Sequence, residues 1–236
     1  LAPSELLTES SGSGGGGSGG NGGGGGDPTP DGILAQYTFD GESLEATTEA
    51  ANATAGTFSA GGGISVNTSS FTADSATHSI NDNVANMEMS EAEAVTNDDY
   101  WSFTVSPAQD ETLNLEEFSV AVARGGGGAS HTGHYALRSS VDGFSSTLGT
   151  VSIGSGGGFD NKETLVVDLT GSEFQGLTGQ VEFRLYTWTD NQTSGWFNRA
   201  DTFTLKGTTG TGNGGGGGGG DPTPVPGGVL AQYVFE

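Results

Sequence analysis

YWSFTVS, residues 100–106, alternates apolar and small polar side chains. Trp101, Phe103 and Val105 fall on one side of this stretch, and the serine and threonine residues fall on the other. VEFRLY, residues 181–186, repeats the pattern with a second apolar row. Because the side chains of a β-strand point alternately to its two faces, both stretches predict strands with one face in a core.

Further stretches on either side of these two have the same character. They lie at residues 33–39, 118–122, 135–141, 148–153, 164–169 and 203–205. Turn signals such as Asp40-Gly41 and Asp142-Gly143 separate several of them. Short strands spaced by such turns predict an all-β fold, an antiparallel two-sheet β-sandwich that is jelly-roll-like and flanked by polyglycine tracts. The one stretch that fits a helix is MEMSEAEAV, residues 87–95.

The chain is strongly acidic. Its 236 residues hold 29 Asp and Glu against 6 Lys and Arg, which gives a net charge of −23. Such a surface repels phosphate backbones and anionic lipid, so we expect no nucleic acid as a partner. No run approaches the roughly 20 apolar residues that cross a bilayer, so we expect no membrane insertion. The scarcity of lysine and the abundance of Ser, Thr, Gly and Asn favour an extracellular or cell-surface protein.

The start of the chain recurs near its end. GGGGGDPTPDGILAQYTFD occupies residues 22–40, and GGGGGDPTPVPGGVLAQYVFE occupies residues 216–236. A repeat separated by about two hundred residues fits a string of whole domains and is too long for a solenoid. We expect this strand to join neighbouring units through the apolar residues of its two copies, namely Leu34, Tyr37, Phe39, Leu230, Tyr233 and Phe235.

The repeat divides the chain into five parts. They are residues 1–11, either the tail of a preceding unit or a free N-terminus; 12–32, a Gly-rich tract and DPTP linker; 33–207, the sandwich; 208–228, a Gly-rich tract and DPTPVP linker; and 229–236, the first strand of the next repeat or a donor strand. Gly/Ser tracts are flexible coil by default. Polyglycine also forms extended polyproline II helices that can bundle through their bare backbones, so an ordered cable is the alternative.

Four motifs carry a resemblance to a known group of proteins. YWSFTVSP, TLNLEEF, YALRSSVDGF and VEFRLY, which begin at residues 100, 112, 135 and 181, resemble the jelly-roll-type β-sandwich repeats of large secreted bacterial surface proteins, including those associated with PEP-CTERM sorting signals. The resemblance covers most of residues 33–206. It implies a role at the cell surface or in a matrix, and it is uninformative about activity. The sorting signal itself is absent from this sequence.

Three aromatic residues are candidates for stacking on sugar rings. Tyr186 and Trp188 share the strand face opposite Val181, and Trp196 follows on a late segment. Exposed aromatic rings on one face of a sandwich would provide a platform for polysaccharide. The alternative, which we favour, is that these rings fill the second layer of the sandwich or a contact between units.

Oxygen-rich turns offer a second kind of site. Asp82, Asp98, Asp99 and Asp190 lie in Asn/Asp pairs, and calcium takes six to eight oxygen ligands. Such pairs also simply make turns. We therefore expect no certain cofactor and name structural calcium as the one candidate. His131 and His134 are too few for a metal site by themselves.

No nucleophile motif, phosphate-binding loop or distinctive carboxylate pair stands out, so we expect no enzyme. The sequence favours a structural repeat unit of an extracellular bacterial filament, sheath or surface stalk, whose partners are copies of itself in a homopolymer or a tandem polypeptide. The alternative function is a carbohydrate- or calcium-dependent adhesin module that binds polysaccharide.

Overall fold

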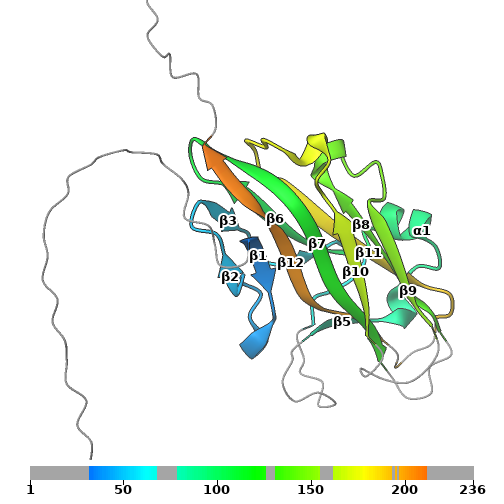
Figure 1. Cartoon of the computed structure of the whole chain (residues 1–236). Coiled ribbons are helices and arrows are strands. Elements are labelled where there is room, and N and C mark those ends of the chain that lie inside the picture. The colour runs from blue at the N-terminus through cyan, green and yellow to red at the C-terminus, as the bar shows by residue number, and fades with distance from the viewer. Residues whose placement is uncertain are drawn as a thin grey trace, which may run out of the picture.

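The computed structural model describes residues 32–67, 79–125, 131–154, 162–192, 195 and 197–211 of the chain. Within this part, two antiparallel sheets pack face to face (Figure 1). The predicted two-sheet antiparallel sandwich is therefore confirmed. The glycine tracts, residues 1–11 and the second copy of the strand lie outside the described residues.

The first sheet, called sheet A below, is built around two long strands. Its order is β10 (Glu163–Asp168), β7 (Glu111–Gly125), β12 (Phe197–Thr211), β1 (Ile33–Tyr37) and β2 (Thr48–Glu49), and β5 (Ile80–Asn83) also pairs with β12. Sheet A therefore places the first strand of the sandwich directly beside the last.

The second sheet, called sheet B, has shorter strands. Its order is β3 (Ala53–Ala55), β6 (Tyr100–Pro107), β11 (Val181–Thr189), β8 (Gly133–Ser139) and β9 (Gly149–Ile153), and β4 (Ser59–Ala60) also pairs with β6. The two stretches whose alternation predicted strands, β6 and β11, are neighbours in this sheet, with Phe183 opposite Phe103.

The core lies between the sheets and is rich in phenylalanine. Phe103 of sheet B stacks on Phe183 at 5.5 Å and on Phe118 of sheet A at 6.2 Å between ring centroids. The apolar rows predicted from alternation are buried, and they are Trp101, Phe103, Val105, Phe118, Val120, Val122, Val181, Phe183 and Leu185. The period of two therefore assigned these side chains to the correct face.

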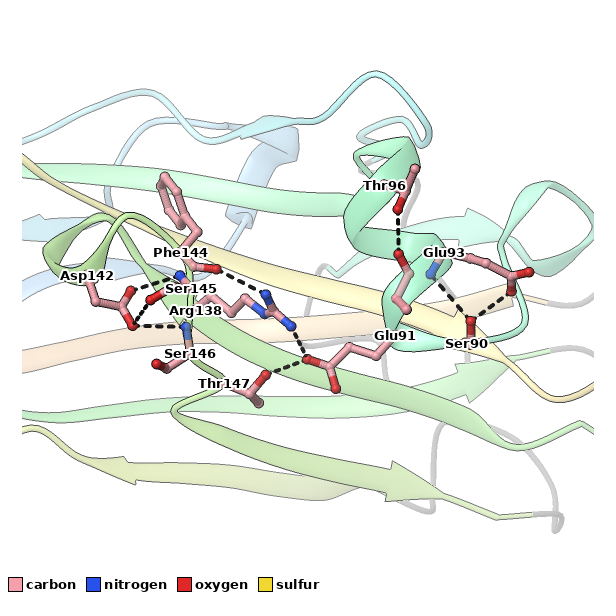
Figure 2. Close-up of polar contacts among 11 residues, drawn as sticks. Ser90, Glu91, Glu93, Thr96, Arg138, Asp142, Phe144, Ser145, Ser146 and Thr147 are labelled. Atoms are coloured by element: carbon pink, nitrogen blue, oxygen red, sulfur yellow. Dashed lines mark hydrogen bonds and ion pairs between the residues drawn. The ribbon is translucent and has the colours of Figure 1, made fainter.

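Among the residues that the structure describes, helical structure is confined to short segments. They are α1 (Glu91–Asn97) and the 3-10 turns η2 (Asp40–Glu42), η3 (Val84–Asn86), η4 (Ser140–Asp142) and η5 (Ser172–Phe174). The stretch 87–95, which the sequence allowed as a short helix or a loop, contributes the first part of α1, and this helix begins at Glu91 because Ser90 caps it. The Ser90 hydroxyl accepts the backbone N–H of Glu93 and donates to the Glu93 carboxylate (Figure 2). No helix of the described residues is long and apolar enough to cross a bilayer.

The chain enters and leaves the sandwich at the same end. Ile33, the first residue of β1, lies opposite Lys206 of β12, and β12 runs on to Thr211 (Figure 1). Because β1 and β12 are adjacent and antiparallel, both connections leave from one end of sheet A. The strand β12 also carries the sandwich four residues beyond Gly207, where the sequence placed its limit.

Candidate functional site

The first copy of the repeated strand is β1, and it is built into sheet A. It pairs with β12 on one side and with the short β2 on the other. The ladder to β12 shifts register between Ile33 and Ala35, and the intervening Leu34 is fully buried. The three residues predicted for this strand, Leu34, Tyr37 and Phe39, are all buried in the sandwich's own core.

Tyr37 is the central anchor of β1. Its ring lies 5.4 Å from that of Phe58 and 5.2 Å from that of Phe103, and its hydroxyl donates to the carbonyl of Gly56 at 2.5 Å. Burial, followed by the nearby carboxylates of Glu45 and Glu49, raises the pKa of the phenol. Tyr37 therefore stays neutral and keeps its donor proton.

Phe39 and Leu34 fix the two ends of the strand. The Phe39 ring meets Phe58 edge-on at 5.0 Å and Phe203 at 5.9 Å. At the other end Leu34 packs over Gly207 of β12, where an added Cβ would lie 2.8 Å from the Leu34 side chain. We call the space that β1 fills between β12 and β2 the β1 slot. Its walls include Phe58, Phe203 and Gly207.

The outer face of sheet B carries two of the three aromatic residues predicted for sugar binding, Tyr186 and Trp188. Tyr186 lies on this face but is only 2 % exposed, because the Tyr100 ring meets it at 5.1 Å and the Arg138 guanidinium lies 5.7 Å from its centroid. The Tyr186 ring therefore offers no open face to a sugar. Trp196 lies outside the described residues.

Trp188 is the aromatic residue of that set that remains half-exposed. Its ring stacks nearly parallel on His134 of β8, with 5.4 Å between centroids and 11° between planes. His134 shares a hydrogen bond with the Ser152 hydroxyl at 2.8 Å, and burial lowers its pKa. Asp190 directly follows the end of β11 at Thr189, and its carboxylate accepts the backbone N–H of Thr132. This corner of sheet B combines aromatic, hydroxyl and carboxylate groups.

A polar clasp holds α1 against sheet B and accounts for the burial of Tyr186. Arg138 of β8 donates to Glu91 of α1 at 2.7 Å and to the carbonyl of Phe144 at 3.0 Å, and Thr147 also donates to Glu91 (Figure 2). Burial alone would raise the Glu91 pKa, but these hydrogen bonds and the Arg138 charge lower it. This clasp has no signature in the sequence, because no local pattern pairs residues this far apart in the chain.

The predicted calcium ligands do not converge on one point. Asp82 of β5 accepts the backbone N–H of Ser65, whereas Asp190 lies beside Thr132. Asp98 ends α1 with φ 61°, and Asp99 follows it, buried. The described residues hold no group of three or more His, Cys, Asp or Glu side chains arranged to hold a metal ion. Calcium therefore stays a prediction.

Asp99 is the most perturbed of these carboxylates. Burial is the largest cause, opposed by the backbone N–H of Glu88, and repulsion from Glu88, Asp82 and Asp98 adds to it, so that the pKa of Asp99 rises to about 6. Burial also raises the pKa of Asp82. The fold thus holds two buried, mutually repelling carboxylates near the start of β6.

No protein-family model matches the chain, and no curated protein does. Several solved structures are similar in fold. The C-terminal family 22 carbohydrate-binding module of Clostridium thermocellum Xyn10B is 18 % identical over 78 % of this chain and 99 % of that one, with a TM-score of 0.41. A xylan-binding domain of the same module family is 17 % identical over 75 % and 97 %, with a TM-score of 0.41. The K3 cleaved adhesin domain of Lys-gingipain from Porphyromonas gingivalis is 13 % identical over 58 % and 78 %, with a TM-score of 0.33. Likeness at this level does not say what this chain binds, and it leaves the resemblance to PEP-CTERM-associated repeats untested.

Proposed function

We propose that this chain is a non-catalytic module of an extracellular surface protein, one β-sandwich in a series whose members each begin with the LAQY strand. Its role is then structural, because the Gly-rich connections space successive sandwiches along the protein. This proposal keeps the structural repeat unit expected from the sequence.

The observation that carries the proposal is where the two copies of the strand differ. Four residues of the first copy are buried and recur unchanged in the second copy: Leu34, Ala35, Tyr37 and Phe39. Of the four residues that are half-buried or exposed, three are replaced in the second copy: Ile33 by Val229, Thr38 by Val234 and Asp40 by Glu236. The fourth, Gln36, recurs as Gln232. A segment under no packing constraint would not keep the buried set. This pattern supports a second copy that begins another sandwich.

The shared entry and exit end gives the series a definite geometry. Because both connections leave from one end of sheet A, each sandwich would project sideways from the Gly-rich connection. Its far end, where β8 begins at Gly133 and β11 ends at Thr189, would then face away from the connection. The corner that holds Trp188 and His134 lies at that far end, in the position best placed to meet another surface.

A two-unit chain tests this proposal. Residues 41–211 are appended after Glu236, so that the second copy precedes a second body. We expect calorimetry to show two sandwiches of similar stability, and Leu230→Asp with Tyr233→Asp to destabilise the second one alone, by about 3 to 5 kcal/mol or more. Val229→Ile with Val234→Thr, which restores the first copy's residues, is the matched control and should change nothing. Equal stability of the second body with and without the two aspartates would refute the proposal.

Polysaccharide binding is a second candidate, favoured by the stacked pair of Trp188 and His134 at the far end of sheet B. An aromatic face beside the hydroxyl of Ser152 and the carboxylate of Asp190 supplies the apolar and polar contacts that a sugar ring takes. The two functions are compatible, because a series of weak sites on one chain multiplies its affinity for a repeating polymer.

Affinity electrophoresis of the full chain through gels that contain plant or bacterial polysaccharides tests the second candidate. We expect retardation by at least one neutral polysaccharide and its loss in Trp188→Ala. Val166→Ala is the matched control, because Val166 is an exposed apolar residue of β10, on the other sheet. Equal retardation of the chain and Trp188→Ala would exclude this surface as the binding site.

A further inference from the structure

We propose that the β1 slot is also a docking site for residues 229–235 of the same chain, which can take the place of β1 as the first strand of the sandwich. The inference rests on the proposed function, since both treat the second copy as equivalent to β1. It goes further, because it lets two segments of one molecule compete for the same position. The chain carries two copies of the strand, and the structure describes one slot for them.

The contacts that hold β1 are supplied by the slot and would be available to either copy. Phe58 and Phe103 flank the tyrosine ring, and the carbonyl of Gly56 accepts its hydroxyl. The bare backbone of Gly207 receives the leucine, and Phe203 meets the phenylalanine. The second copy presents leucine, tyrosine and phenylalanine at the same spacing.

The residues that the second copy lacks contribute little to the slot. Thr38 is the main loss, because its hydroxyl bonds to the carboxylate of Asp40 and the hydroxyl of Thr47. Both bonds are exposed to water, where such bonds add little to stability. Gln36, which donates to the Thr204 hydroxyl at 3.1 Å, is retained as Gln232.

The connection is long enough for the exchange. A strand that replaces β1 must begin opposite Lys206, five residues back along β12 from Thr211. That is about 17 Å along the strand and about 5 Å across to its neighbour. Residues 212–228 join Thr211 to Val229, and a linker of this length spans at most about 60 Å. The second copy can therefore enter the slot in the direction that β1 has.

Chain connectivity decides which copy holds the slot. Tyr37 is followed within three residues by η2, so β1 is held at its slot by the body itself. The second copy arrives through a long linker and has a lower effective concentration. We therefore expect β1 to hold the slot in the unaltered chain, and the second copy to take over when β1 is weakened.

Three variants of residues 1–236 test this. The first carries Leu34→Ala and Tyr37→Ala, the second Leu230→Ala and Tyr233→Ala, and the third all four substitutions. We expect the second variant to keep the urea midpoint of the unaltered chain and the third to show a large drop. The urea midpoint of the first variant should fall by no more than half as much as that of the third. Amide exchange in the first variant should show residues 230–235 protected more strongly than in the unaltered chain. The same urea midpoints are compared for Leu34→Ala alone and for Leu34→Ala with Leu230→Ala, because these single-site changes destabilise the sandwich less.

Equal midpoints for the first and third variants, with no protection of residues 230–235, would overturn the inference. A rescue that depends on protein concentration, with a doubled mass in sedimentation, would overturn it as well, because the strand would then come from a second molecule. Neither result touches the two-unit chain described above. If that chain needs its second copy while no rescue occurs here, the proposed function stands and only the docking fails.

Discussion

Asp99→Asn removes a buried carboxylate that lies near other carboxylates of the sandwich. The Asp99 side chain accepts the backbone N–H of Glu88 at 3.1 Å. Its burial disfavours the charged form, and the carboxylates of Glu88, Asp82 and Asp98 repel that charge. An Asn oxygen can accept the same N–H without carrying a charge. We therefore expect Asp99→Asn to raise the free energy of unfolding at neutral pH, although it deletes a native interaction.

The magnitude follows from the pKa. The pKa of Asp99 is raised from 3.8 to about 6. Because the folded state holds the proton more tightly, this group favours folding below pH 3.8, and the advantage is lost as the pH rises through 6. A shift of roughly two units corresponds to at most about 3 kcal/mol. The Asn amide needs a partner of its own, so we expect a gain of about 1 to 2 kcal/mol at pH 8 that vanishes near pH 4.

Urea unfolding followed by tryptophan fluorescence, at pH values from 4 to 8, measures both chains. The quantity of interest is the difference in the free energy of unfolding between Asp99→Asn and the unaltered chain, because acids that do not interact with Asp99 titrate equally in both. A difference that stays constant across the pH range would refute the reasoning. The same series with 5 mM calcium tests the predicted calcium site. This concentration is about five times a millimolar Kd. Calcium bound at the Asp99 carboxylate would stabilise the unaltered chain and not the variant.

Further substitutions test other parts of the structure. Glu91→Gln should weaken the clasp with Arg138 by about 1 kcal/mol and speed amide exchange in α1, while leaving exchange in sheet A unchanged. Gly207→Val should cost about 3 kcal/mol or more in thermal unfolding, since its Cβ would clash with the β7 backbone and with Leu34. Tyr135→Phe should cost about 1 to 3 kcal/mol in urea unfolding, because the buried Tyr135 hydroxyl bonds to backbone of both β7 and β12. Unchanged unfolding in either of the last two would contradict the contacts described.

Much of the sandwich was predictable from local pattern. The alternation around Phe103 and Phe183 reports which side chains face inward, because a strand's period of two is fixed by its backbone. The repeated LAQY strand likewise required only comparison of the chain with itself. Leu34, Tyr37 and Phe39 were recognised as anchors in this way, and the structure places them in the sandwich's own core.

Other features were decided by tertiary contacts between distant residues. Alternation places Tyr186 on the outer face of its strand but does not say what covers it, and the structure packs Arg138 and Tyr100 against its ring. Asp99 looks like an ordinary turn residue, and only its burial in the fold, together with the nearby carboxylates of Glu88 and Asp82, raises its pKa.

The sequence by itself therefore determined the central strands, their inward faces and the existence of a second copy of the first strand, whereas the short strands β2 to β5 were not predicted. Which strands are neighbours, and hence that β1 lies against β12 and that chain entry and exit share one end, was decided only by the tertiary structure. The physical reason is that side-chain alternation is a property of each strand alone, whereas register and burial depend on partners far away in the chain.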